Sequence, residues 1–257
     1  MRGQIASTRR GLRAAAVCAA WLSALAVPAV GQAARAEHHP ARHHHLKREV
    51  LSHPGYASTW AYLEAATDAY ASPSRHALVL GYLPTTTQDA TSQLLLEQQR
   101  VLIHGGWWVQ VRLPLRPAGQ IGWVPERTLG APQTVHTYLV VSTEKTTLTL
   151  YRNGKVIFQT RVGTGKPSTP TPHGQFYIRD RLDGFAPGSI FGPVAFGTSA
   201  LSDVETDWPG GGVIGIHGTN EPSLIPGHPS HGCIRLPNWE IVKLARLLPI
   251  GTPLTIE

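Results

Sequence analysis

Two histidines and one cysteine lie within 17 residues, between positions 217 and 233 of the 257-residue sequence. His217 ends an apolar run, and His231, Gly232 and Cys233 are consecutive. A thiol is a good nucleophile only as its thiolate. Because the ordinary cysteine pKa is about 8.5, the thiol is mostly protonated at neutral pH. A cysteine nucleophile therefore needs a base or a positive charge nearby. This pattern indicates nucleophilic acyl transfer by Cys233, with an imidazole as its base.

The elements around these residues can bring them together. Val213–His217 is an expected strand, and if it pairs with the Cys233 segment, His217 can reach the thiol from the neighbouring strand. His231 lies two residues before Cys233, and in an extended segment two such residues share a face. Glycine lets backbone groups approach a substrate closely, so the N–H groups around Gly232 and Cys233 are candidates for an oxyanion hole.

Two other uses of the same residues stay open. His217, His231 and Cys233 are all possible zinc ligands, and His228 would supply a fourth. Against zinc, no CxxC or HxxxH pair lies near Cys233. A lone cysteine is often an inert apolar residue of the core, but the neighbours of Cys233 are mainly polar.

The first 36 residues have the layout of a secretory signal peptide. Four arginines precede an apolar or small run at positions 14–30, and Ala34–Ala36 supplies a small-residue cleavage site. We therefore expect residues 1–36 to be removed and the protein to be exported. A membrane anchor retained through an uncleaved segment is the alternative, although the run is short for a spanning helix and contains Pro28.

Removal of this segment changes both the charge and the cysteine count. It leaves 18 basic and 16 acidic residues, a net charge of +2. Nucleic-acid binding is then not indicated, because it normally requires a basic face on the folded domain. Cys233 becomes the single cysteine, so an intramolecular disulfide is excluded and a free thiol is expected.

Residues 37–130 are expected to form a linker and a first small domain. Residues 37–66 contain a His-rich linker and a lead-in, and the stretch 56–70 has a weakly helical composition. Residues 67–130 contain short apolar or alternating runs between Gly and Pro turns, which indicates a small β-barrel. Trp107–Val111 and Gly119–Val124 resemble the last strands of the bacterial SH3-like domain. Three tryptophans of these runs either line a binding groove or form the core: Trp107, Trp108 and Trp123.

Residues 136–257 are expected to form a second, mainly β domain with one helix near its C-terminal end. Asn153-Gly154 between two β-patterned runs predicts a hairpin, because both turn positions need positive φ. An apolar stripe at Ile241, Leu244 and Leu248 predicts a helix with Asn238 as its N-cap. The expected strands are Thr137–Val141, Thr147–Arg152, Lys155–Val162, Gln175–Ile178, Val213–His217 and Pro253–Ile256.

The run His217-Gly218 followed by Ser230-His231-Gly232-Cys233-Ile234-Arg235 resembles the signature of the L,D-transpeptidases, the YkuD-type catalytic domain. The resemblance covers Thr137–Glu257. It includes Thr171–Ile178, where the family usually has Thr-Pro-x-Gly-x-Phe. It implies a β-sandwich or mixed sheet with a long cleft. It also implies a place in the bacterial periplasm, in the cell wall or on the outer face of the membrane.

The same resemblance implies acyl transfer between peptidoglycan stem peptides in cell wall biogenesis. Cys233 attacks the carbonyl of the third residue of a tetrapeptide stem, D-alanine leaves, and an amine of a second stem resolves the thioester into a 3→3 cross-link. An existing amide supplies the energy, so no cofactor is needed. Covalent inhibition by carbapenem-type β-lactams is expected.

The resemblance also assigns roles to single residues. His217 is the general base, and the Gly218 carbonyl fixes its tautomer. His231 supports the thiol, while Ser230 is a hydrogen-bonding residue rather than a second nucleophile. Arg235 either holds a substrate carboxylate or belongs to a structural ion pair.

Related and unrelated functions remain as alternatives. Water could resolve the acyl-enzyme, which would make the protein an L,D-carboxypeptidase, or a protein amine could resolve it and anchor that protein to peptidoglycan. A non-catalytic wall-binding protein that acts through its SH3-like domain is the alternative of another class. The complete set of His217, His231 and Cys233 argues against it, because a binding module has no need of a reactive thiol.

Overall fold

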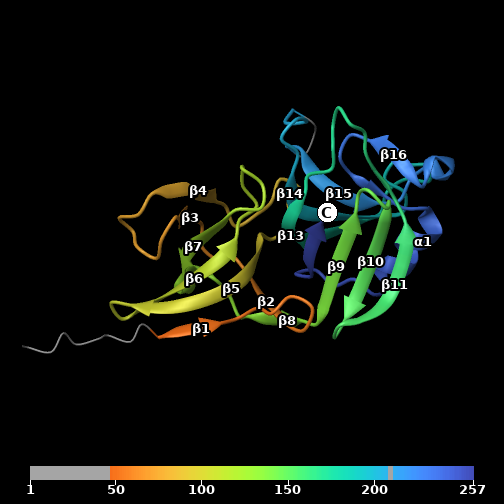
Figure 1. The fold of residues 1–257 in the computed structure, drawn as a ribbon. Coiled ribbons are helices and arrows are strands. Elements are labelled where there is room, and N and C mark those ends of the chain that lie inside the picture. Colours follow the sequence, from red (N-terminus) through yellow and green to blue (C-terminus); the bar gives the residue numbers. More distant parts are fainter. Residues whose placement is uncertain (1–46, 208–210) are drawn as a thin grey trace, which may run out of the picture. The chain divides into compact units, whose positions relative to one another are not determined.

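The computed structural model describes residues 47–207 and 211–257, which form two sheets and one α-helix, α1 (Asn238–Ala245) (Figure 1). The mainly β fold expected from the sequence is confirmed. The expected signal peptide and the His-rich tract lie outside the described residues and stay predictions. Within the described residues, no helix is long and apolar enough to cross a membrane.

The first sheet has eight strands among the described residues, in the order β4-β3-β7-β6-β5-β2-β8, with β1 paired to β5. Its core includes Leu63, Leu95, Val111 and Val124, all nearly inaccessible to solvent. The strands are β1 (Arg48–Val50), β2 (Ser58–Tyr62), β3 (Thr67–Tyr70), β4 (Val79–Leu83), β5 (Leu94–Ile103), β6 (Gly106–Arg112), β7 (Ile121–Pro125) and β8 (Gln133–Val135), and a short 3-10 helix, η1, spans Glu126–Thr128.

The helical expectation for residues 56–70 is wrong. This stretch forms β2 and β3, and β2 pairs with both β5 and β8. Alanines gave the stretch its helical composition, but pairing and burial of alternate side chains decide a strand. Because β1 and β2 belong to this sheet, the sheet also begins earlier than residue 67. The SH3-like character of residues 67–130 stays a prediction.

The three tryptophans of this sheet have different surroundings. Trp108 and Trp123 are each 9% exposed and pack with Tyr70. Trp107 is half-buried, and the guanidinium of Arg100 lies 4.5 Å from its ring centroid, a cation–π arrangement. Two of the three therefore belong to the core, and Trp107 lies at the surface.

The second sheet has ten strands among the described residues, in the order β11-β10-β9-β18-β13-β14-β15-β17-β12-β16. The C-terminal strand β18 lies between β9 and β13, which places the C-terminus in the middle of the sheet (Figure 1). The strands are β9 (Thr137–Ser142), β10 (Thr147–Arg152), β11 (Lys155–Arg161), β12 (Gly163–Gly165), β13 (Gly174–Asp183), β14 (Val194–Leu201), β15 (Val213–His217), β16 (Gly227–Ser230), β17 (Ile234–Arg235) and β18 (Pro253–Ile256), and a second 3-10 helix, η2, spans Pro222–Leu224.

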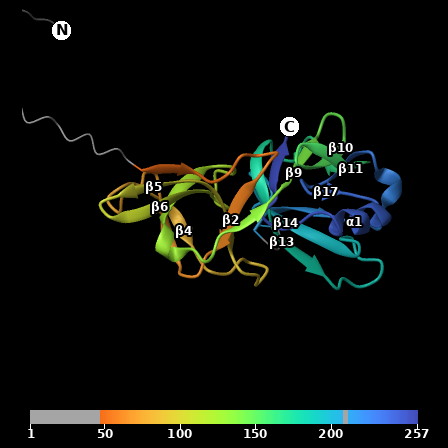
Figure 2. The same cartoon turned by 90° about the horizontal axis from the view of Figure 1, so that it is seen from below.

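The predicted hairpin and helix are both present. Asn153 and Gly154 have φ angles of 49° and 74°, as the tight turn between β10 and β11 requires. Helix α1 lies against β14 and buries Ile241 and Leu244 in the core of the sheet (Figure 2). Its N-cap is Pro237 rather than Asn238, whose side chain has another partner in the site described below.

Strand β14 was not predicted from the sequence. All eight of its residues are buried, and it lies between β13 and β15. A strand covered on both faces does not alternate between apolar and polar residues, and this one also contains Gly197, Thr198 and Ser199. The period-two signal was therefore missing.

Candidate functional site

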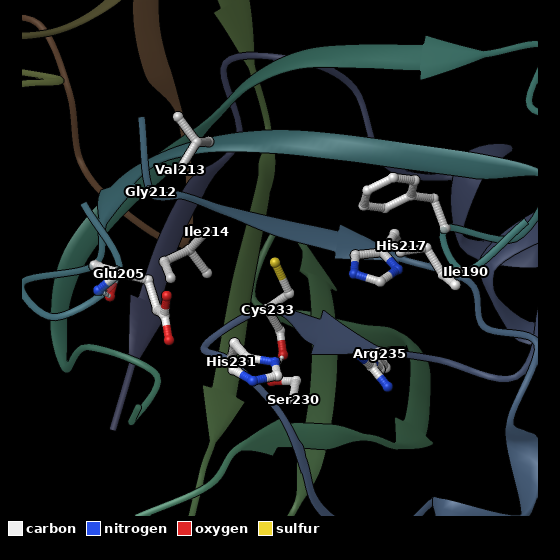
Figure 3. Close-up of a pocket in the computed structure, with 12 residues that line it drawn as sticks. Ile190, Glu205, Gly212, Val213, Ile214, His217, Ser230, His231, Cys233 and Arg235 are labelled. Carbon is white, nitrogen blue, oxygen red and sulfur yellow. Dashed lines mark hydrogen bonds between the residues drawn. The ribbon is translucent and has the colours of Figure 1, made fainter. Parts of the chain in front are cut away.

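Two neighbouring parallel strands hold the predicted nucleophile and base. In the register of β15 and β17, Ile216 pairs with Ile234 and His217 pairs with Arg235. Cys233 immediately precedes β17, so the expected pairing of the His217 strand with the Cys233 segment is confirmed. Both side chains face one pocket of about 170 Å³ (Figure 3). Its lining includes Glu205, His217, Ser230, His231, Cys233 and Arg235.

The Cys233 thiol is half-buried and lies beside the middle of β15. The N–H of Gly215 donates a hydrogen bond to Sγ at 3.4 Å. Burial raises the pKa of the Cys233 thiol, while the Gly215 N–H and the charge of Arg235 partly oppose this effect. The thiol is therefore protonated at neutral pH and needs a base during attack.

The His217 ring is oriented by the chain that follows it. Its side chain is buried, with 3% of the residue exposed, and Nδ1 lies 2.6 Å from the carbonyl oxygen of Gly218. A carbonyl can only accept, so Nδ1 carries the proton and the lone pair of Nε2 is left for a substrate or thiol proton. Phe191 packs its ring against the imidazole in an edge contact, with centroids 5.2 Å apart.

The protonation state of His217 suits a base. Burial lowers its pKa to about 4, and the charge of Arg235 acts in the same direction, against the hydrogen bond to Gly218. The imidazole is therefore neutral at pH 7. With a protonated thiol and a neutral imidazole, the resting pair carries no net charge, and the thiol proton must move as the nucleophile attacks.

Asn238 holds the loop that carries the Gly218 carbonyl. Its Oδ1 accepts a hydrogen bond of 2.8 Å from the N–H of Thr219. This contact ties the first residue of α1 to the residue directly after Gly218. The sequence suggested a helix cap for Asn238, and its role in the site became visible only in three dimensions.

The loop before Cys233 is held by side-chain hydroxyls. Ser230 is completely buried, and its Oγ donates to the Cys233 carbonyl at 2.5 Å and accepts from the Gly232 N–H at 3.1 Å. Thr171 Oγ1 donates to the Gly232 carbonyl at 2.7 Å and accepts from the Gly165 N–H at 2.8 Å. The motif containing Thr171 was noted in the sequence, but this anchoring role was not assigned.

These contacts change the expectation for the oxyanion hole. The Gly232 N–H, expected to be a donor to substrate, is already bonded to Ser230 Oγ. Gly232 instead provides the bend, with a φ of +119°, and a Cβ there would lie 2.9 Å from Ile214 Cδ1. The backbone N–H of Cys233 is left as the candidate donor in this loop.

His231 differs from the expectation of a shared face with the thiol. His231 and Gly232 form a bend, so the argument from an extended segment does not apply. His231 is exposed, and its Nε2 lies 2.8 Å from Nζ of Lys166. It still lines the pocket, but from the rim (Figure 3).

Of the two alternatives for Arg235, the ion pair is present, and the contact with a substrate carboxylate stays a prediction. Its Nη1 lies 3.5 Å from the Glu221 carboxylate, and the Arg235 side chain is 18% exposed. Its Nε is buried and has no hydrogen-bond partner within the described part of the chain. The guanidinium therefore has an ion pair on one side and also lines the pocket.

The zinc alternative requires a cluster of ligands. Across residues 47–207 and 211–257, no three His, Cys, Asp or Glu side chains are grouped as a metal site would require. His228, considered as a fourth ligand, instead has its Nδ1 2.8 Å from Thr164 Oγ1.

Comparison with known proteins gives a consistent assignment for the second sheet. Residues 136–256 match the family model of the YkuD L,D-transpeptidase catalytic domain. YkuD of Bacillus subtilis (strain 168) is 37% identical over 140 residues, which are 54% of this chain and 76% of the relative.

Solved structures of L,D-transpeptidases also align with this chain. The catalytic domain of the Enterococcus faecium enzyme is 29% identical, with 47% of this chain and 96% of that chain covered and a TM-score of 0.35. LdtMt1, solved in complex with imipenem, is 20% identical, with 59% and 91% covered and a TM-score of 0.38. On the family model and the Bacillus relative, the chain belongs to the YkuD family of L,D-transpeptidases.

Proposed function

We propose that this protein is a cysteine-dependent peptidoglycan L,D-transpeptidase that forms 3→3 cross-links in the cell wall. The observation that carries the proposal is the pairing of β15 with β17, which places a neutral, oriented His217 and the Cys233 thiol at one pocket. Stem peptides of peptidoglycan are the substrate class that the family assignment suggests.

Acylation begins with the Cys233 thiol and a tetrapeptide stem. Nε2 of His217 takes the thiol proton as Sγ attacks the α-carbonyl carbon of the third residue, and the Cys233 N–H donates to the developing oxyanion. The amide bond to D-alanine then breaks, its nitrogen takes the proton back from His217, and a thioester remains.

Deacylation transfers the stem to an amine. The side-chain amine of a second stem attacks the thioester carbonyl, His217 accepts the amine proton, and the carbon–sulfur bond breaks. The proton returns to the thiolate, so the protein leaves the cycle unchanged. The amide broken in the first half has been exchanged for an amide formed in the second, which explains why no external energy source is needed.

Purified tetrapeptide stems provide the test. Incubation with the exported form of the protein should release D-alanine and give cross-linked dimers, which mass spectrometry identifies. Tripeptides without dimers would instead show that water resolves the thioester and that the protein is an L,D-carboxypeptidase. Unchanged tetrapeptides with the wild-type protein would contradict acyl transfer altogether.

A further inference from the structure

The charged groups of the pocket are ordered along β15. The Glu205 backbone lies against Gly212, the residue just before the strand, the Cys233 thiol contacts Gly215 at its middle, and Arg235 pairs with His217 at its end. Figure 3 shows Glu205 and Arg235 on opposite sides of Cys233. Among the described residues that line the pocket, Glu205 is the one acid and Arg235 the one guanidinium or ammonium.

The loop that carries Glu205 is held in place at both of its ends. Ser202 Oγ accepts a hydrogen bond of 2.9 Å from the Glu205 N–H. Nη2 of Arg116, in the loop between β6 and β7, donates to the carbonyls of Ser202 and Gly211, at 3.0 and 2.8 Å. These contacts hold the backbone at Ser202, Glu205 and Gly211, and the Glu205 carboxylate has no hydrogen bond or ion pair to any residue that the structure describes.

The spacing along the strand matches a substrate with charges on both sides of the reacting carbonyl. A strand rises about 3.3 Å per residue, so each end of β15 lies about 7 Å along the strand from Gly215, the residue that contacts the thiol. The side chain of a long diamino acid, with a stem similar to that of lysine, reaches about this far from its own carbonyl carbon. On the other side of that carbonyl, the departing D-alanine carries a carboxylate.

We propose that the Glu205 carboxylate binds the side-chain ammonium of the diamino acid in the acyl-donor stem. This inference rests on the proposed function and extends it to the choice and orientation of the donor. With the ammonium at Glu205, the D-alanine carboxylate points toward Arg235 and the scissile carbonyl lies at Cys233. A stem placed in the reverse direction would bring like charges together at both ends of the pocket.

The acidic surroundings of Glu205 support a cationic ligand. Asp203 and Asp207 belong to the same loop and are exposed. With Glu205 they give this loop three negative charges, and the guanidinium of Arg116, which donates to two carbonyls of the loop, offsets one of them. Asp203 does not line the pocket, which makes it a matched control for Glu205.

The test uses the full exported protein and two tetrapeptide stems, one with a free side-chain amine and one with that amine acetylated. D-alanine release under single-turnover conditions measures acylation alone. Glu205→Gln should lower kcat/KM about tenfold for the free-amine stem and leave the acetylated stem unchanged, because only the first stem has the ammonium partner. Asp203→Asn should leave both values within about twofold.

Three results would overturn the inference. An equal loss with both stems would show a structural effect of Glu205, and no loss with either would show that it does not contact the donor. Normal acylation combined with slower cross-linking would place Glu205 at the acceptor amine instead. Absence of D-alanine release by the wild-type protein would contradict the proposed function itself, which keeps the two failures distinct.

Discussion

His217 and His231 both line the pocket that contains Cys233, but the two rings have different surroundings. His217 is 3% exposed, and a backbone carbonyl sets its tautomer. His231 is exposed at the rim, and its ring contacts the ammonium group of Lys166. Proximity to a cysteine in the sequence therefore does not identify the base. Burial and tautomer favour His217 for that role, because burial holds the imidazole neutral and the hydrogen bond at Nδ1 keeps Nε2 available.

Replacement of the buried histidine should have the largest effect. His217→Gln removes the proton acceptor, and acylation of Cys233 by a tetrapeptide stem should slow by about 10² to 10⁴-fold. The measurement is the rate of D-alanine release under single-turnover conditions. Circular dichroism of the variant serves as the control for folding. A folded His217→Gln protein that is acylated at the wild-type rate would show that His217 is not the proton acceptor.

The pH dependence should separate the buried ring from an ordinary histidine. The pKa of His217 lies near 4, so the neutral base persists as the pH falls and is lost only when the pH passes below that value. An ordinary histidine with a pKa of about 6.5 would be mostly protonated at pH 5.5, and activity would drop about tenfold there. We expect kcat/KM for acylation to stay nearly constant from pH 7 to 5.5. An acidic limb centred near pH 6.5 would contradict the assigned role.

Loss of the support behind His217 should have an intermediate effect. Asn238→Ala removes the acceptor for the Thr219 N–H, which loosens the loop that carries the Gly218 carbonyl, and kcat should fall about tenfold. Asn238→Asp retains an acceptor oxygen and should recover most of the activity. If both variants lose activity equally while remaining folded, the oxygen of Asn238 is not what positions the ring.

Replacement of the rim histidine should have the smallest effect. His231→Gln removes the ring contact with Lys166, an interaction at the exposed edge of the pocket, and acylation should change by less than about threefold. A loss of acylation comparable with that of His217→Gln would show that exposure is a poor guide to function here. Lys166→Gln, measured in parallel, reports whether any effect depends on this contact.

Much of the site could be predicted from the sequence because its signals are local. His217 ends an apolar strand, and the Gly232 bend precedes the strand that begins at Ile234, so their pairing follows from short segments. Strand β14 could not be predicted, because burial on both faces removes the alternation that identifies a strand. Glu205 and Asn238 also lacked a local signal, since each reaches the site through contacts between distant segments.

The first sheet also contains a strand, β2, that could not be predicted from its own residues. Residues 58–62 join it only by pairing with β5 and β8, which lie 32 or more positions further along the chain. The helical composition of this region comes mainly from residues 61–66, with three alanines, a leucine and a glutamate, and the pairing outweighs that local preference. The turn at His104 and Gly105, with φ angles of 48° and 77°, has the geometry of the predicted Asn-Gly turn and its usual glycine, but histidine takes the place of asparagine at the first position.

Trapping of the acyl-enzyme tests the central claim most directly. The wild-type protein, Cys233→Ala and His217→Gln are incubated with a carbapenem, and intact mass and peptide mapping locate any adduct. We predict one covalent adduct on Cys233 in the wild type, a slower adduct in His217→Gln and none in Cys233→Ala. An unmodified wild-type mass, or an adduct that persists in Cys233→Ala, would contradict the assignment of Cys233 as the nucleophile.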